Sequence, residues 1–332
     1  MLKAKHAQLT DKIQKTRGCA RSSARVYASN LSRIHREFLP KTKYAQDLKW
    51  LGEKAVPLLA KLKKIENINT QRNMLAASLV ALDILGKTKV RPAYVAQIAV
   101  LNKKKDQIAQ SGKMSEKQAA KYLDWKQILK LRRLLNRTVR LGRYYSRAKI
   151  IKSEFTVIQQ NLVLHLYTML PPVRNDWSSV RFLSEKEWDE LSETEKTSSN
   201  NLVLARGGYR VYWAKYKTAK KHGVIQQIIP KALQTLLKKH IKFLRTHYPE
   251  NDHLLLNNMK RPLSSNGLTK FLQRMFYKHY RKKISTTALR SIFLSNKFDK
   301  NVLEEQRTIA KAMHHTPATA RDYYVKHRGK PL

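Results

Sequence analysis

Apolar residues recur at helical spacing through most of the first half of this chain, and this pattern limits the folds open to it. The segments that carry the pattern are 22–39, 69–85, 93–105 and 116–143. The stretch Gln110-Ser111-Gly112-Lys113 is the clearest linker signal among them. We therefore predict an all-helical domain over residues 21–112. Residues 1–20 are basic and are predicted to form a poorly ordered lead-in.

The second half of the chain mixes helical and strand patterns. An apolar helix is predicted from Glu154 to Leu170, where Pro171-Pro172 stops it. Gly207-Gly208 is a hairpin signal. The predicted strands are 202–204, 209–216 and 224–229. The predicted fold class is therefore mainly α with a small antiparallel β-sheet, in which the all-helical domain is followed by an α+β domain over residues 116–332.

The charge of the chain favours a polyanionic partner. Its 332 residues include 68 Lys and Arg against 23 Asp and Glu, a formal net charge of +45. Nucleic acid is the first candidate. A membrane is disfavoured, because no long basic amphipathic helix is evident and the apolar stretch from Met74 to Leu85 is short and contains Asp83. The first 18 residues have no apolar run typical of a signal peptide.

Motifs for metal- or nucleotide-dependent chemistry are not found. The single cysteine, Cys19, excludes an intramolecular disulfide and a multi-cysteine zinc site, and it fits a reducing compartment. Gly86-Lys87-Thr88 looks like the end of a phosphate-binding loop, but the earlier glycine is replaced by Ala81. We therefore predict no cofactor and no metal.

Five residues are candidates for phosphodiester chemistry. They are Arg174, Lys217, Arg290, His315 and Tyr324. Taken singly, each has an ordinary structural interpretation, such as a surface charge or a packed terminal helix. Their order is more informative, because a histidine lies nine positions before a tyrosine, with a helix predicted to start at Thr316 and Pro317.

This order of residues resembles the tyrosine recombinase (phage-integrase) family of DNA strand-exchanging enzymes. The resemblance covers most of the chain. The helical half is similar to the core-binding, DNA-binding domain of that family, and residues 116–332 to its catalytic domain. The segment from Leu166 to Trp177 and the string at 216–223 are most similar to integrases of virophages, large eukaryotic DNA viruses and crypton-type elements.

The resemblance implies a role for each candidate. Arg174 and Arg290 would hold the non-bridging oxygens of the scissile phosphate and stabilise the transition state. His315 would donate a further hydrogen bond to that phosphate. Lys217 would protonate the 5′-oxygen leaving group, and Tyr324 would form a 3′-phosphotyrosyl bond without metal or ATP.

The chain departs from the pattern of the family at two positions. The family usually has histidine three residues before the second arginine, where this chain has Thr287. Tyr324 would then lose its proton less readily, or lose it to another group such as His314. An acidic residue is usual three positions after the first arginine, and here Asp176 lies one position earlier as a supporting candidate. Tyr323 is the rival nucleophile, and the nine-residue spacing favours Tyr324.

The resemblance implies a site-specific recombinase, an integrase or transposase of a mobile genetic element. Its partners would be double-stranded DNA and further copies of itself, from dimer to tetramer on paired sites, with no membrane and no small-molecule substrate. The expected location is intracellular, wherever the target DNA lies: host nucleus, viral factory or prokaryotic cytoplasm. Two alternatives stay open, a catalytically silent DNA-binding protein on the same fold and an enzyme resembling type IB topoisomerases or telomere resolvases.

Overall fold

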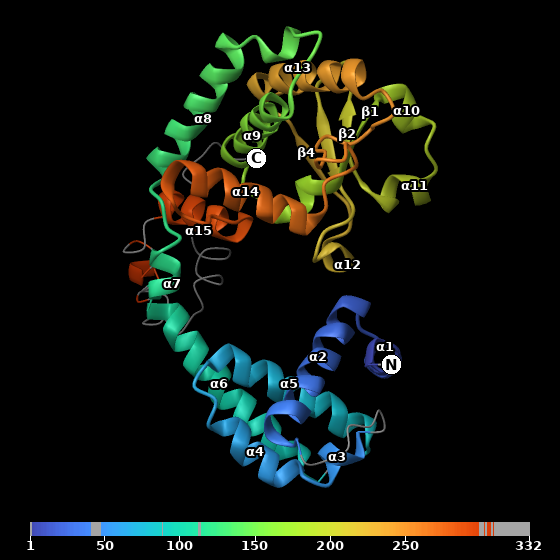
Figure 1. Ribbon diagram of the computed structural model, residues 1–332, viewed down its shortest axis with the longest axis vertical. Helices are drawn as coiled ribbons and strands as arrows, with labels where there is room; N and C mark the ends of the chain where they lie inside the picture. The colour runs from blue at the N-terminus through green and yellow to red at the C-terminus, as the bar shows by residue number, and fades with distance from the viewer. Residues whose placement is uncertain are drawn as a thin grey trace, which may run out of the picture. The chain divides into compact units, whose positions relative to one another are not determined.

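The computed structural model describes residues 2–40, 48–87, 89–111 and 114–298, together with 302, 304–306 and 308 (Figure 1). The chain divides into two compact units, Met1–Lys113 and Met114–Leu332. This division falls at the linker signal in the sequence. Each unit has its own hydrophobic core.

Helices make up the described part of the first unit. They are α1 (Leu2–Arg17), α2 (Arg21–Phe38), α3 (Lys49–Gly52), α4 (Ala55–Lys63), α5 (Ile68–Ile84) and α6 (Arg91–Ser111). Helix α5 is central, since it packs against α1, α2, α3, α4 and α6. Its N-cap is Asn67, whose side chain accepts a hydrogen bond from the N–H of Thr70.

The prediction of a poorly ordered lead-in over residues 1–20 is wrong, because residues 2–17 form α1. Leu9 and Ile13 lie four residues apart on one face of this helix and are fully buried against the helices of the first unit. Asp11 forms an ion pair with Arg21 at 2.6 Å. Two apolar side chains at helical spacing are enough to dock a segment that is otherwise basic.

The second unit begins with helices that support its core. They are α7 (Glu116–Ala119), α8 (Trp125–Leu141), the short 3₁₀ turn η1 (Tyr144–Ser146) and α9 (Lys152–Met169). The helix predicted over 116–143 is divided in two because Asp124 starts a new one, with its N–H donating to Gln127 Oε1 at 3.0 Å. Helix α9 ends immediately before Pro171-Pro172, as predicted.

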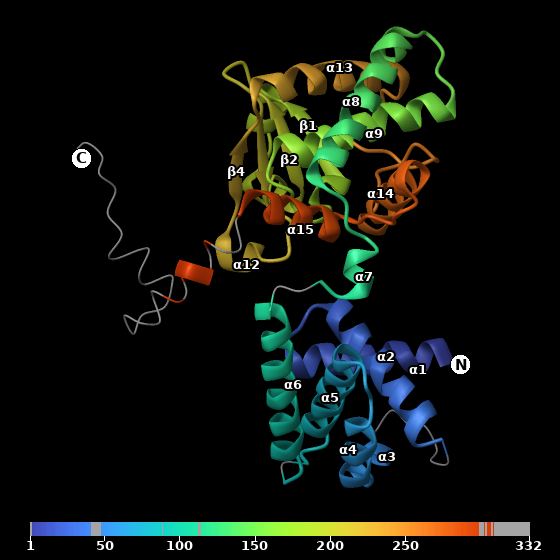
Figure 2. The same cartoon turned by 90° about the vertical axis from the view of Figure 1, so that its left-hand side faces the viewer.

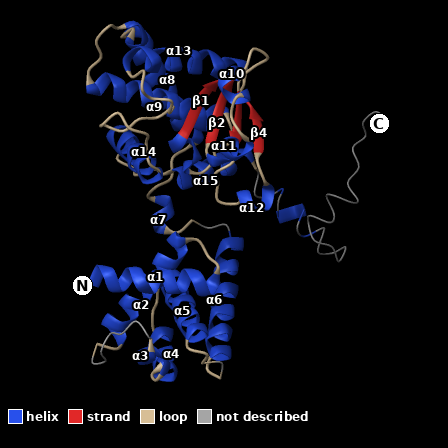
Figure 3. Cartoon of the chain, turned by 90° about the vertical axis from the view of Figure 1, so that its right-hand side faces the viewer, coloured by secondary structure: helices blue, strands red, loops and turns tan. Residues whose placement is uncertain are grey.

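Four strands form one sheet in the order β1-β2-β3-β4 (Figure 3). The strands are β1 (Val180–Ser184), β2 (Asn200–Leu204), β3 (Arg210–Trp213) and β4 (Ile225–Ile228). The predicted hairpin is confirmed, with β2 antiparallel to β3 and Gly208 at φ 122° between them. The sheet is mixed, however, because β1 is an additional strand that pairs parallel with β2. Helices α10 (Glu185–Asp189) and α11 (Glu193–Ser198) provide the crossover that parallel pairing requires.

The remaining helices of the second unit carry part of the candidate site. They are η2 (Asn175–Ser179), α12 (Ala219–His222), α13 (Lys231–His247), α14 (Ser265–Tyr280) and α15 (Thr286–Lys297). The chain is thus mainly helical with a small four-stranded mixed sheet, which confirms the predicted fold class apart from the parallel strand. Among the described residues, no helix is both long enough and apolar enough to cross a membrane.

Candidate phosphate-binding site

Arg174 lies in the turn between α9 and η2. The chain leaves α9 at Leu170, passes two prolines and enters η2 with Arg174 at its N-cap. The buried hydroxyl of Tyr167 donates a hydrogen bond to the Arg174 carbonyl oxygen at 2.5 Å. This bond holds the backbone of the turn against α9, while the Arg174 side chain is exposed.

Arg290 lies in the second turn of α15. The helix starts at Ser285, whose side chain accepts a hydrogen bond from the N–H of Ala288 at 3.4 Å. Leu289 and Ile292 anchor α15 in the core, which leaves Arg290 half-buried at the edge. Thr287, the position where a histidine was expected, is exposed in the first turn.

Asn175 joins the turn of Arg174 to the start of α15. Its Nδ2 donates to Ser265 Oγ and to Thr269 Oγ1, each at 3.0 Å. Its Oδ1 accepts from Thr286 Oγ1 at 2.7 Å. One amide therefore fixes η2 against α14 and α15 at the residue next to Arg174 and one helical turn before Arg290.

Asp176 lies in the electrostatic field of both arginines. Burial raises the pKa of its carboxyl, and the guanidinium groups of Arg174 and Arg290 oppose that rise. Burial also raises the pKa of Tyr167, with Asp176 adding to the rise and Arg290 opposing it. The guanidinium groups of Arg174 and Arg290 thus influence the same carboxyl group, although the two residues are far apart in the sequence.

Lys217 is exposed in the turn between β3 and α12. The base of that turn is held by Asn200, a residue of β2 that is 1% exposed. Asn200 Oδ1 accepts from the N–H groups of Ala214 and Lys215 at 3.0 and 2.7 Å. Its Nδ2 donates to the carbonyl oxygens of Lys215 and Asp176 at 3.0 and 3.4 Å.

A tryptophan pair gives a second connection between the same two segments. Trp177 of η2 and Trp213 of β3 meet edge to face with ring centroids 4.8 Å apart, and both rings are buried. The segment of Arg174 and the turn of Lys217 are therefore fastened to each other by a side-chain amide and by an aromatic contact. The structure brings the supports of three predicted site residues, Arg174, Lys217 and Arg290, into one connected assembly.

The three cations make no direct polar contact in the part of the chain that the structure describes. Within the described residues, the side chains of Arg174, Lys217 and Arg290 form no hydrogen bond and no ion pair within 4 Å. A guanidinium presents a planar fork of donors that matches the oxygens of a phosphate, and two guanidinium groups at one site can hold both non-bridging oxygens of a phosphodiester in a fixed orientation. The arrangement suits recognition of a phosphodiester.

Three predicted site residues, His314, His315 and Tyr324, lie outside the described residues. In the part of the chain that is described, no group of three or more His, Cys, Asp or Glu side chains is placed to hold a metal ion.

Asn175 and Asn200 are two residues of the candidate site that the sequence analysis missed. Asn200 could have been found, since a polar residue within an apolar strand is buried only with partners for its amide. Asn175 carries no such signal, because its three partners lie 90 to 111 residues away in the sequence.

Comparison with known proteins gives structural neighbours only. No protein-family profile and no curated protein sequence matches the chain. Among solved structures, the XerH site-specific recombinase bound to its difH substrate in a pre-cleavage complex is 16% identical, with a TM-score of 0.47 over 97% of this chain and 81% of that one. The XerA recombinase is 11% identical, with a TM-score of 0.33 over 98% of this chain and 95% of that one.

Proposed function

We propose that this chain is a site-specific DNA recombinase of the tyrosine type, which cleaves and rejoins duplex DNA through a 3′-phosphotyrosyl intermediate. The observation that carries the proposal is the connected assembly around Asn175 and Asn200. Through Asn175 it connects the turn of Arg174 to the helix of Arg290, and through Asn200 it connects η2 to the turn of Lys217. Among the described residues, none of the three cations forms an ion pair.

The proposed reaction is a transesterification. The two arginines and His315 hold the non-bridging oxygens and offset the charge that develops on the pentacoordinate phosphorus. The Tyr324 oxygen attacks phosphorus as its proton leaves to a base, for which His314 is the candidate. The 5′-oxygen departs with a proton from Lys217. One P–O bond forms and one breaks, so the energy of the phosphodiester is conserved for rejoining.

The finer assignment rests on sequence resemblance. We infer an integrase or transposase of a mobile genetic element, with the integrases of virophages, large DNA viruses and cryptons as the nearest group. Two to four copies would assemble on paired sites in double-stranded DNA inside the cell, in the host nucleus or viral factory, or in the cytoplasm of a prokaryote.

The proposal is tested by trapping the covalent intermediate. Nicked suicide duplexes, taken from the DNA that flanks the gene, should give a protein–DNA adduct that survives denaturant. Tyr324→Phe should abolish the adduct, and Tyr323→Phe is the matched control that should retain it. An adduct that persists in Tyr324→Phe would show that the nucleophile is assigned wrongly, and the absence of any adduct with wild-type protein would overturn the proposal.

A second candidate function is DNA binding without cleavage. Thr287 favours it, since an exposed hydroxyl is a poor general base at the position where the family usually has histidine. Tight binding to the flanking DNA without any adduct would support this candidate. Exchange of strands between two sites, as opposed to relaxation of supercoils alone, would separate a recombinase from an enzyme resembling a topoisomerase.

A further inference from the structure

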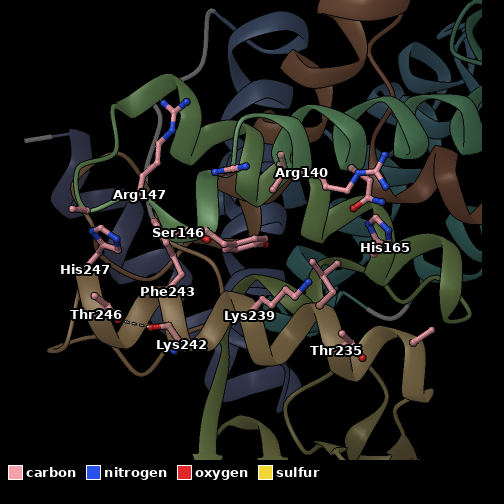
Figure 4. Close-up of a pocket in the computed structure, with 17 residues that line it drawn as sticks. Arg140, Ser146, Arg147, His165, Thr235, Lys239, Lys242, Phe243, Thr246 and His247 are labelled. Carbon is pink, nitrogen blue, oxygen red and sulfur yellow. Dashed lines mark hydrogen bonds between the residues drawn. The ribbon is translucent and has the colours of Figure 1, made fainter.

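A basic cavity of about 850 Å³ lies along α13, between that helix, α8 and the turn that follows α8 (Figure 4). We call it the α13 trough. Five cationic side chains line it: Arg140, Arg143, Arg147, Lys239 and Lys242.

The positive charge of the trough is largely uncompensated. No aspartate or glutamate is among the residues that line it. Arg147 pairs with Glu154, a largely buried residue just outside the cavity. Within the described part of the chain, the other four cations form no ion pair. Like charges held side by side repel one another, so the trough is a site where an anion is bound favourably.

The floor of the trough belongs to the packed core of the second unit. Val139 and Phe243 belong to the main core of the second unit. The Phe243 ring meets Tyr145 edge to face at 5.9 Å. His240 beneath them is completely buried and hydrogen-bonds the Leu254 carbonyl oxygen at 3.0 Å. Recognition in the trough therefore rests on charge, and the rings are already used in packing.

The trough is too long for a single phosphate group. Its lining on α13 runs from Ala232 to His247, which is about 22 Å at the rise of an α-helix. A nucleic-acid strand in a duplex carries one charge per about 3.4 Å of axis, so about six phosphates span this length. The length suits a phosphodiester backbone, and cations line the trough on both sides: Lys239 and Lys242 on α13, and Arg140, Arg143 and Arg147 at the end of α8 and in the turn that follows it.

The trough is separate from the candidate phosphate-binding site. Within the second unit, α13 lies at one end, and α12 and α15 lie at the other in both views (Figures 1 and 2). Lys217 immediately precedes α12, and Arg290 is part of α15.

We propose that the α13 trough binds the phosphodiester backbone of a nucleic-acid segment other than the one that is cleaved. The proposal rests on the proposed function in taking nucleic acid as the partner of the chain and in placing cleavage at the other site. The trough is a second cationic surface, away from the candidate phosphate-binding site, and a second nucleic-acid segment can bind there.

The first test uses the wild-type, full-length protein and lysine acetylation read by mass spectrometry. Saturating 20-nucleotide oligonucleotides, single-stranded and duplex in separate arms, should protect Lys239 and Lys242 at least about fivefold. Lys231 and Lys238 are exposed on the same helix, do not line the trough and should stay reactive. If only one of the two oligonucleotides protects these lysines, the result shows whether the trough binds single-stranded or duplex nucleic acid. Equal reactivity of all four lysines in both arms would overturn the proposal.

The second test changes charge inside and outside the trough by the same amount. The trough variant carries Gln at Arg140, Arg143, Lys239 and Lys242. The matched control carries Gln at Arg133, Arg137, Lys231 and Lys238, which are exposed on the same two helices outside the trough. Each lost phosphate contact lowers the log–log salt slope of binding by about 0.7 to 0.9, so we expect a reduction of about 3 in the trough variant and less than about 1 in the control.

An acidic partner is the rival occupant, and poly-glutamate of similar charge distinguishes it. Protection of Lys239 and Lys242 by poly-glutamate but not by oligonucleotides would sink the proposal, as would equal salt slopes in the two variants. Adduct formation by the wild-type protein is a separate measurement. Protection without an adduct would overturn the proposed recombinase function but support nucleic-acid binding in the trough. An adduct without protection would support the recombinase function and overturn nucleic-acid binding in the trough.

Discussion

The amide of Asn175 uses its donor and its acceptor on three hydroxyl groups from α14 and the start of α15. Each of these hydrogen bonds contributes about 0.5 to 1.5 kcal/mol to stability, which is typical of hydrogen bonds in proteins. What distinguishes Asn175 is its place between Arg174 and the helix of Arg290. We therefore infer that it is a positioning residue, which would act on a bound phosphate through its neighbours.

Asn175→Ala should therefore slow the chemistry more than it weakens DNA binding. A displacement of about 1 Å at a reacting group costs about 100-fold in rate, so we expect adduct formation to fall about 10- to 100-fold, measured under single-turnover conditions. Equilibrium binding to duplex DNA, set by many phosphates, should be nearly unchanged. Asn296→Ala, at an exposed asparagine of α15, is the control and should keep the wild-type rate. Equal rates in the two variants would contradict a positioning role.

Asp176 gives a prediction on pH. Folding raises the pKa of its carboxyl above the ordinary value of 3.8, so the ionised form costs stability once the pH exceeds the folded-state pKa, and the cost disappears below 3.8. Asp176→Asn should raise the urea midpoint at pH 7 and lose that advantage as the pH falls toward 4. Asp189→Asn, at an exposed aspartate, should show no such trend. A gain that grows on acidification would contradict the sign.

At the scale of elements, the question is whether α1 is packed into the first unit. Leu9 and Ile13 are fully buried, although the segment around them is rich in lysine. Leu9→Ala should cost about 2 to 5 kcal/mol of unfolding free energy through lost burial and the cavity left behind. Gln8→Ala, at the exposed neighbour, should change it by less than about 0.5 kcal/mol. Urea unfolding followed by circular dichroism measures both, and equal stabilities would mean that α1 is not docked.

The sequence predicts best those elements whose apolar pattern continues over many residues or whose end is marked by proline or glycine. Helix α9 ends at its proline pair, and the β2–β3 hairpin turns at Gly208. Strand β1 has only five residues, and its VRFLS shows no clean alternation of apolar and polar side chains, so periodicity cannot find it. Arg174, Lys217 and Arg290 could be chosen from order along the chain. The amide contacts that connect their segments depend on long-range packing, so they could not be predicted from the sequence.

At the scale of the whole molecule, charge is the dominant property. A net charge of +45 and two separate clusters of free cations predict that binding to duplex DNA is strongly salt-dependent. We expect the logarithm of the binding constant to fall with the logarithm of salt at a slope of about −5 or steeper, since each neutralised phosphate contributes about 0.9. Titrations between about 50 and 300 mM salt measure the slope, and an affinity that hardly changes over this range would contradict extensive phosphate contact.

The junction at Asn175 also limits how relatives of this chain can diverge. Its amide meets hydroxyl groups at Ser265, Thr269 and Thr286, and serine and threonine present the same hydroxyl. Exchange between these two residues keeps every hydrogen bond, whereas an apolar side chain leaves part of the amide without a partner. Where relatives keep asparagine after the first arginine, we expect drift at these three positions to stay within serine and threonine. Three hydroxyl-bearing positions far from Asn175 in the sequence, together with the asparagine itself, then form a sequence signature that identifies such relatives.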